Sequence, residues 1–185
     1  FMAKKENMIT DVESFAGKKI RSPAGEILSN TMSALGASAM SIDPAELAPA
    51  LEQGVVDGIT STANFVYENK FPIESYTMIP LNSYALTTII SLEKFNSLST
   101  ELQNILVETG VDYESYVDEM HVQNLIEVID NFKNDWGIDP YIPTEEEVNE
   151  YKEVLLPVKT KWAESVDGGQ ELLDEINKLS SHPQN

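Results

Sequence analysis

Three short runs of β-forming residues alternate with segments of helical spacing in the first part of the chain. The runs cover 18–22, 37–42 and 55–59, and each ends at a turn marked by Gly, Pro or Ser. Strands that alternate with helices in this way predict an α/β domain with a sheet of parallel strands. In such a sheet the ligand crevice lies outside the carboxyl ends of the strands, where the following helices begin. We therefore expect an α/β fold with a site at that edge.

Polar side chains follow all three runs. Arg21 ends the first run, Asp43 and Pro44 follow the second, and Thr60 and Ser61 follow the third. A guanidinium group holds a carboxylate through two parallel hydrogen bonds, and hydroxyl or backbone donors complete such a contact. The pattern indicates a site for a small carboxylate. Two alternatives stay open: Arg21 forms a surface ion pair, and Thr60 and Ser61 cap the helix that follows.

Aromatic residues near the third turn are candidates for the apolar wall of this site. Phe65 and Tyr67 lie in the helical segment after Ser61, and Tyr84 lies further along the chain. Aromatic residues at such spacing are more often part of the core, so both interpretations stay open.

Turn and cap residues define the other elements expected in the first half. Pro23 suits the first turn of a helix that Gly36 ends, and Asp43 caps a second helix that Gly54 ends. The remaining elements expected here are a helix over 62–70 and strands over 76–81 and 84–90.

The second half of the chain has the spacing of long helices. Ser99 is expected to cap a helix that runs to about Asn134, with Gly110 as a candidate kink. Such a helix measures about 50 Å at 1.5 Å per residue, so it has to bridge two lobes. Thr144 and Glu147 predict a capping box for the next helix. A short strand at 136–138, a bend or end at Pro157 and a last helix around 172–179 complete the prediction.

The composition excludes several classes of function. A net charge of −19 argues against a nucleic-acid partner or an anionic membrane surface, because both need clustered Lys and Arg. The chain has no cysteine, which excludes disulfide scaffolds, thiolate metal sites and thiol nucleophiles. No apolar run approaches the length of a membrane span, and the first residues do not resemble a signal peptide.

The sequence shows little catalytic equipment. A nucleophile elbow, a phosphate loop and a dinucleotide fingerprint are all missing from it. His121 and His182 have no evident carboxylate or nucleophile partner. Acid pairs such as Asp43 with Glu46 offer oxygen ligands, but without the pattern of a metal-binding loop. We therefore expect a protein that is not an enzyme, with no catalytic residue, no metal and no cofactor.

Four stretches of the chain form a specific pattern in a fixed order. They are Phe-Ala-Gly-Lys-Lys-Ile-Arg-Ser-Pro from residue 15, Ala-Leu-Gly-Ala-Ser from residue 34, Asp-Pro-Ala-Glu-Leu from residue 43 and Leu-Glu-Gln-Gly-Val-Val-Asp-Gly from residue 51. Together with a helix start at 95–106, they resemble the solute-binding proteins of tripartite ATP-independent periplasmic (TRAP) transporters, DctP type. The resemblance covers essentially the whole chain.

The resemblance implies a fold, a function and roles for single residues. The fold is periplasmic-binding-protein-like, type II, with two lobes that close on a hinge. The function is that of a receptor that captures a small organic acid outside the cytoplasmic membrane and delivers it to a TRAP permease. Arg21 matches the arginine that pairs with the substrate carboxylate. Ser61 falls where many members carry a side-chain amide, and Pro44 where many carry an aromatic residue, so the polar contact and the pocket wall differ here.

The resemblance also implies a domain organisation. Family members are longer, so the chain is expected to lack a first lobe and a signal peptide. Residues 1–86 and 127–185 would form the second lobe, and a crossover strand and helix in 87–126 would complete the first. Apolar faces at 86–90 and 102–116 would then lose their partner, which predicts a dimer or an oligomer with exchanged elements. The alternative is a stand-alone acidic interaction module whose long helix contacts a protein partner.

Overall fold

The computed structural model describes residues 1–81 and 87–180 and contains one five-stranded sheet of order β3-β2-β4-β1-β5. β2 runs parallel to β3 and β4, whereas β1 runs antiparallel to β4 and β5. The α/β prediction is confirmed, but the sheet is mixed rather than wholly parallel. The strands are β1 (Met2–Ala3), β2 (Lys19–Arg21), β3 (Ser38–Met40), β4 (Gly58–Ile59) and β5 (Ser75–Tyr76).

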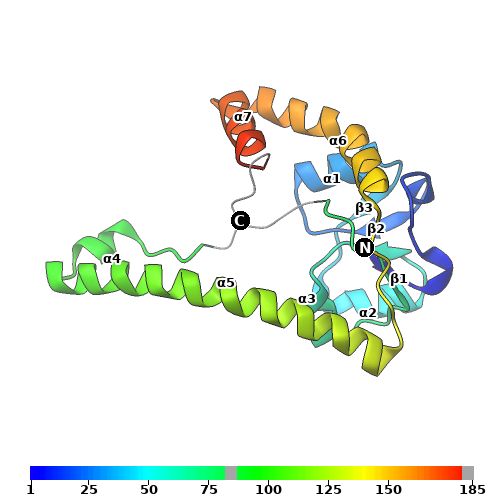
Figure 1. Cartoon of the computed structure of the whole chain (residues 1–185), viewed down its shortest axis with the longest axis horizontal. Coiled ribbons are helices and arrows are strands. Elements are labelled where there is room, and N and C mark those ends of the chain that lie inside the picture. Colours follow the sequence, from blue (N-terminus) through cyan, green and yellow to red (C-terminus); the bar gives the residue numbers. More distant parts are fainter. Residues whose placement is uncertain (82–86, 181–185) are drawn as a thin grey trace.

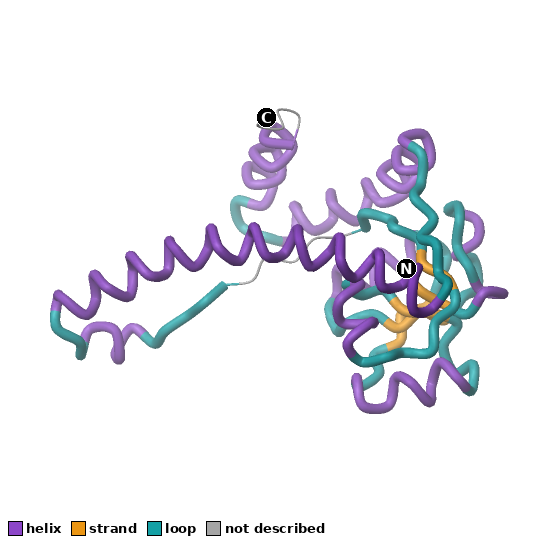
Figure 2. Tube along the Cα trace, turned by 60° about the horizontal axis from the view of Figure 1, so that its bottom comes forward, coloured by secondary structure: helices purple, strands orange, loops and turns teal. Residues whose placement is uncertain are grey.

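Helices lie on both sides of this small sheet, and one long helix extends far beyond it (Figure 1). The same arrangement is visible from a second direction in Figure 2, where the strands gather at one end of the molecule. The helices are η1 (Lys5–Asn7), η2 (Glu13–Phe15), α1 (Glu26–Ala34), α2 (Pro44–Glu52), α3 (Ala63–Glu68), α4 (Leu92–Asn96), α5 (Thr100–Trp136), α6 (Glu145–Ser165) and α7 (Gly169–Ser180).

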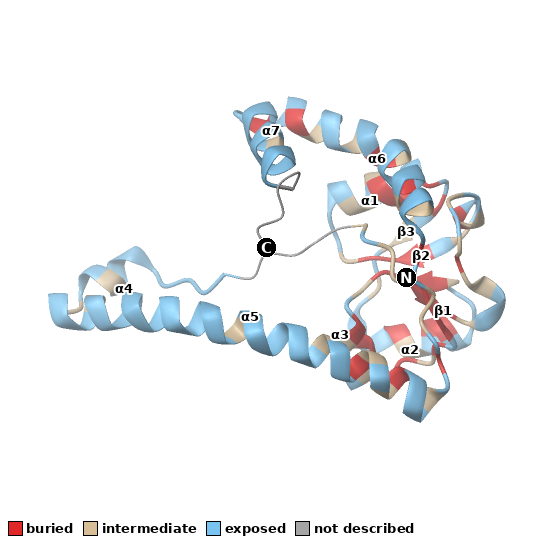
Figure 3. Ribbon diagram, in the orientation of Figure 1, coloured by how far each residue is buried: buried red, intermediate tan, exposed pale blue. Residues whose placement is uncertain are grey.

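Two apolar clusters form the core, one on each side of the sheet. Met2 belongs to the cluster that includes residues of α2, α3 and the end of α5. Its neighbours Phe1 and Ala3 belong to the cluster that includes residues of α1 and α6. Successive residues of a strand point to opposite faces, so β1 contributes to both clusters. Figure 3 shows the buried residues concentrated at this end of the molecule.

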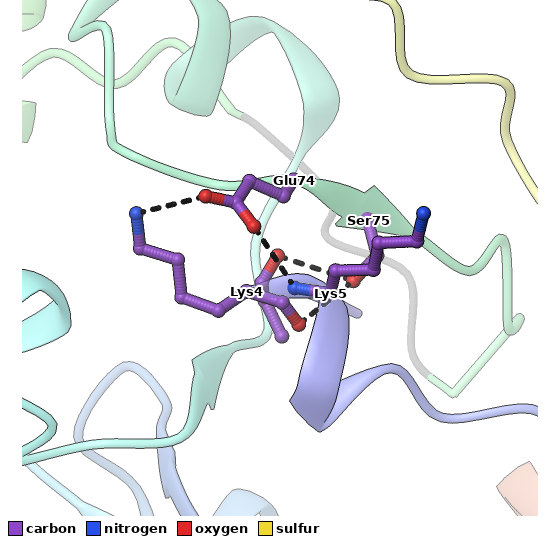
Figure 4. Close-up of polar contacts among 5 residues, drawn as sticks. Lys4, Lys5, Glu74 and Ser75 are labelled. Atoms are coloured by element: carbon purple, nitrogen blue, oxygen red, sulfur yellow. Dashed lines mark hydrogen bonds and ion pairs between the residues drawn. The ribbon is translucent and has the colours of Figure 1, made fainter.

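Strand β1 is packed tightly between β4 and β5. A Cβ atom on Gly58 of β4 would collide with the ring of Phe1 and the carbonyl oxygen of Met2, so this position requires glycine. At the other end of β1, Lys4 Nζ lies 3.4 Å from Glu74 Oε1, and Ser75 Oγ donates to the carbonyl oxygen of Ala3 at 3.1 Å (Figure 4). The buried Ser75 bond contributes more to stability than the exposed ion pair.

The helix caps that the sequence predicts are present. Asp43 accepts a hydrogen bond from the backbone N–H of Ala45 at 2.9 Å and begins α2. Ser99 caps α5, and Thr144 and Glu147 form the reciprocal capping box of α6. Each of these caps depends on residues two or three positions apart, which is why the sequence alone located them.

Several predicted strands are shorter than expected or missing. The first three runs contain β2, β3 and β4, but only part of each run is hydrogen-bonded in the sheet. Of the strand expected over 76–81, only Tyr76 belongs to β5. Residues 87–90 form no strand, because no neighbouring strand pairs with them in the described part of the chain; residues 84–86 of that prediction lie outside the described residues.

Two further expectations are also wrong, and of the bend or end expected at Pro157 the end is excluded. Pro23 does not lie in the first turn of α1, because the chain stays non-helical until Gly25 and the helix begins at Glu26. No strand forms at 136–138: Trp136 is the last residue of α5, and Gly137 ends the helix in a left-handed conformation with φ 67°. Pro157 lies inside α6 and does not end it.

α5 is long and mostly exposed (Figure 3). Its 37 residues correspond to about 55 Å at 1.5 Å per residue. The helix continues without interruption through Gly110, so the candidate kink is wrong. Neither α5 nor another described helix is both long enough and apolar enough to cross a membrane. The apolar face expected over 102–116 is exposed and includes Leu102, Ile105, Leu106, Tyr113 and Tyr116.

Lys70 is strained at the end of α3, and its replacement by Gly is expected to stabilise the protein. Lys70 has a φ of 51°, and the N–H of Phe71 donates to the carbonyl oxygen of Val66 at 3.2 Å, as in a Schellman cap. A left-handed conformation costs a non-glycine residue about 1–2 kcal/mol. Glycine avoids that cost but loses more chain entropy, so we expect Lys70→Gly to raise the free energy of unfolding by about 0.5–1 kcal/mol. Urea denaturation measures the change, and a lower midpoint in the variant would contradict it.

Candidate functional site

The carboxyl ends of the three parallel strands meet at one edge of the sheet. Arg21, the last residue of β2, pairs in register with Met40 of β3 and Ile59 of β4. The chain then leaves β3 towards α2 and β4 towards α3, so the three predicted turns lie next to one another. The convergence expected from the sequence is therefore confirmed for the backbone.

Arg21 is the only arginine in the chain, and it is buried, with 7% of its surface exposed. Its Nε donates a hydrogen bond to the carbonyl oxygen of Ile42 at 3.3 Å. Its own carbonyl oxygen accepts a hydrogen bond from the N–H of Thr60 at 2.9 Å. The first contact holds the guanidinium beside the start of α2, and the second holds the backbone of Arg21 beside the end of β4. Arg21 is therefore not exposed at the surface, and the alternative that placed it there is wrong.

Thr60 and Ser61 do not cap α3, because Thr62 does. The Oγ1 atom of Thr62 accepts a hydrogen bond from the N–H of Phe65 at 3.4 Å. Thr60 is buried, and its Oγ1 atom has no hydrogen-bond partner among the described residues. Ser61 is half-buried. A buried hydroxyl without a partner is costly, so the Oγ1 atom of Thr60 retains the capacity for a hydrogen bond at this edge.

Of the candidates for the apolar wall, Pro44 and Phe65 differ in position, and Tyr84 lies outside the described residues. Pro44 is the first residue of α2 and is exposed at the edge. Phe65, in α3, is partly buried; its ring lies 5.4 Å from the ring of Phe71, and it packs against the core. Phe65 therefore has the core role that aromatic spacing suggests, and only part of its surface remains for a ligand.

Two features of this edge escaped sequence reasoning. Ser22 is buried next to Arg21, with 3% of its surface exposed, and its place directly after Arg21 is the signal that could have identified it. The carbonyl oxygen of Ile42, which holds Arg21, carries no sequence signal because every residue has a carbonyl group.

An acidic hollow on α6 is unsuited to an anion. A hollow of about 550 Å³ beside the first turns of α6 is lined by Glu145, Glu146, Asn149, Glu150 and Glu153. Four of these five side chains are carboxylates, which repel a carboxylate ligand. Within residues 1–81 and 87–180, no group of three or more His, Cys, Asp or Glu side chains is arranged to hold a metal ion. The edge with Arg21 is thus the better candidate site for a small acid.

Comparisons with known proteins agree with this geometry. The C4-dicarboxylate-binding periplasmic protein DctP of Rhodobacter capsulatus is 22% identical over 160 residues, which are 85% of this chain and 48% of that protein. The chain spans about half the length of the curated relatives it matches.

Solved structures show the same fold. A TRAP periplasmic solute-binding protein from Desulfovibrio salexigens with bound orotic acid superposes with a TM-score of 0.77 at 21% identity, over 96% of this chain and 57% of that one. A TRAP solute-binding protein from a marine metagenome, in complex with metahydroxyphenylacetate, superposes with a TM-score of 0.80 at 19% identity, over 99% and 60%. These likenesses confirm the fold class, and both neighbours are binding proteins.

The model of one protein family matches nearly the whole chain. Its description is bacterial extracellular solute-binding protein, family 7, also called DctP, and the match covers residues 1–165. The match extends from β1 to the end of α6 and includes all three turns at the candidate site. The chain therefore belongs to the DctP family of bacterial extracellular solute-binding proteins.

Proposed function

We propose that this chain is part of an extracytoplasmic receptor that binds a small organic acid and delivers it to a TRAP-type membrane permease. Membership of the DctP family supports this function. The three relatives described above take C4-dicarboxylates, orotic acid or metahydroxyphenylacetate, which are all carboxylic acids. The periplasm is the proposed compartment, since these relatives are periplasmic or belong to periplasmic transport systems.

The buried position of Arg21 at the carboxyl end of β2 is the single observation that carries the proposal. A protein of net charge −19 repels an anion at most of its surface. A guanidinium group held in a low-dielectric environment binds a carboxylate more strongly than one in water does. Arg21 thus offers a focused positive charge where the fold places ligands.

The other candidate residues take supporting roles in this proposal. The hydroxyl groups of Thr60 and Ser61 make polar contacts with the acid, and Thr60 gains the partner that its Oγ1 atom lacks. Pro44 and the free side of Phe65 form the apolar wall. No residue is assigned to catalysis, and the receptor needs no cofactor for capture.

We further propose that the described chain forms one lobe and part of another. Segments 1–86 and 127–185 belong to the second lobe, and 87–126 completes the first. The support is the contrast along α5: Val128 and Phe132 are buried against the sheet domain, whereas every described residue of 100–124 except Gln103 and Val117 is exposed. A stand-alone interaction module is not favoured, because the family match runs through both parts.

A ligand screen on the complete product of the gene tests the proposed function. Small mono- and dicarboxylic acids, including succinate, orotate and hydroxyphenylacetate, are added at about 100 times the expected dissociation constant, which stabilises a binding protein by about 2.7 kcal/mol. At least one acid is expected to raise the melting temperature, and its uncharged amide is not. If no acid acts, or if the amides act equally well, a carboxylate receptor is the wrong assignment.

The 185-residue chain alone is expected to self-associate. Burying apolar surface is worth about 25 cal/mol per Å², and the exposed face of α5 is apolar along several turns. Repulsion between copies of charge −19 opposes association, so a dimer or an oligomer with exchanged elements should strengthen as salt screens the charges. Sedimentation equilibrium at tens of micromolar, roughly the range of weak association, measures this. A monomer at both low and high salt would contradict it.

A further inference from the structure

The short helix α3 connects the candidate site to the long helix α5. The turn with Thr60 and Ser61 leads directly into α3, and Phe65 lies within it. α3 packs against the last part of α5, and Figures 1 and 3 show the two helices side by side. α3 has only six residues, and helices this short depend on tertiary packing rather than on their own hydrogen bonds. What holds α3 on α5 therefore also holds the ligand-facing turn.

Tyr67 makes the contacts that join the two helices. Its ring meets Phe132 edge to face, with centroids 5.7 Å apart, and lies 5.2 Å from the ring of Trp136. Its hydroxyl group donates a hydrogen bond to Asp135 Oδ2 at 2.5 Å. Phe132 is fully buried and also meets Tyr76 of β5. The hydrogen bond to a carboxylate is charge-assisted and thus stronger than one between neutral groups.

We propose that the Tyr67–Asp135 hydrogen bond is a latch that fixes α3 on α5 and thereby positions Ser61 and Phe65 for the ligand. The part of this proposal that concerns the ligand rests on the proposed function. The latch acts through α3, so Tyr67 is a positioning residue rather than one that touches the acid. The aromatic contacts pack the two helices together. The hydrogen bond adds a directional contact between them, since its geometry tolerates little displacement.

Tyr67→Phe removes the hydroxyl group and keeps the ring. Hydrogen exchange is measured at the amides of Val66, Asn69 and Phe71, which donate hydrogen bonds within α3 and its cap. We expect the exchange of these amides to become about tenfold faster, because the loss of one charge-assisted hydrogen bond makes local opening of α3 easier. Exchange of the amide of Thr60, which bonds to β2, should change much less. Unchanged exchange in α3 would overturn the latch without reference to any ligand.

Ligand affinity tests the positioning role on the complete gene product. The acid identified in the screen should bind Tyr67→Phe about three- to tenfold more weakly, whereas Asp135→Asn, which keeps an acceptor for the hydroxyl group, should retain most of the affinity. Faster exchange in α3 with unchanged affinity would overturn the positioning role and leave the proposed function intact. If the unmodified protein binds no acid, the proposed function fails, and the ligand half of this inference fails with it.

Tyr141→Phe is the matched control. Tyr141 also donates a hydrogen bond to a carboxylate, Glu147 Oε1, at 2.6 Å, but this bond joins a loop to α6 rather than to α3. A general loss of stability would affect both variants alike. An equal loss of affinity in Tyr141→Phe would therefore assign the loss to stability and overturn the positioning role.

Discussion

Arg21→Ala is expected to weaken binding of the cognate acid by about 2–5 kcal/mol, the range for removing one partner of a buried charge pair. The variant removes both the positive charge and the fork of N–H donors from the edge of the sheet. The acidity of the rest of the chain then acts on the ligand without compensation. Isothermal titration calorimetry on the complete gene product measures the loss.

Two further variants separate charge from geometry. Arg21→Lys keeps the positive charge but cannot form two parallel hydrogen bonds, so a smaller but definite loss is expected. Lys19→Ala removes an exposed cation from the same strand and should leave the affinity within about twofold, because exposed charges interact weakly in water. Unchanged affinity in Arg21→Ala, in a protein that still folds, would remove Arg21 from the site.

Local chemistry explains what the sequence could predict of the fold. Asp43, Ser99 and Thr144 cap helices by contacts with residues two or three positions away, so their roles can be recognised without knowledge of the rest of the chain. The alternation of strands and helices predicts the parallel arrangement of β2, β3 and β4 for the same reason. These elements needed no information from distant segments.

Long-range contacts explain what the sequence could not predict. Strand β1 has two residues, and its partners are Ile59 and Tyr76, far along the chain from Met2. No local pattern marks such a strand. Residues 87–90 have the composition of a strand but no partner to pair with in the described residues, which shows that β-forming residues are not sufficient.

At the candidate site, too, the sequence predicted what depends on local chemistry and missed what depends on long-range contacts. The sequence placed Arg21, Thr60 and Ser61 at strand ends, and the topology brings those ends together. It could not show that Arg21 is buried against the carbonyl oxygen of Ile42, or that Thr62 rather than Thr60 caps α3. Both depend on the angle at which the next helix leaves the sheet, and that angle is set by packing.

A polypeptide that begins at Phe1 is expected to lose stability as the pH falls from 8 to 5. The α-amino group of Phe1 is buried and donates a hydrogen bond to the carbonyl oxygen of Thr77 at 2.8 Å. Burial lowers the pKa of this group from 8.0 to about 5, because a charge is costly away from water. The unfolded chain therefore binds a proton between pH 8 and pH 5 that the folded chain does not, and the free energy of unfolding falls across this window. The total loss is about 4 kcal/mol at about 1.4 kcal/mol per pKa unit.

The matched control is the same polypeptide with an acetylated α-amino group, which cannot take up the proton. Urea denaturation of both forms at several pH values gives two profiles, and their difference cancels every other titrating group. Above pH 8 the amine is neutral in both the folded and the unfolded state, so the difference should be independent of pH. Between pH 8 and pH 5 the free amine should lose stability relative to the acetylated form, and below about pH 5 the difference should level off, because both states are then protonated. Parallel profiles throughout would mean that the amine of Phe1 is solvated in the folded chain and does not bind to the carbonyl oxygen of Thr77.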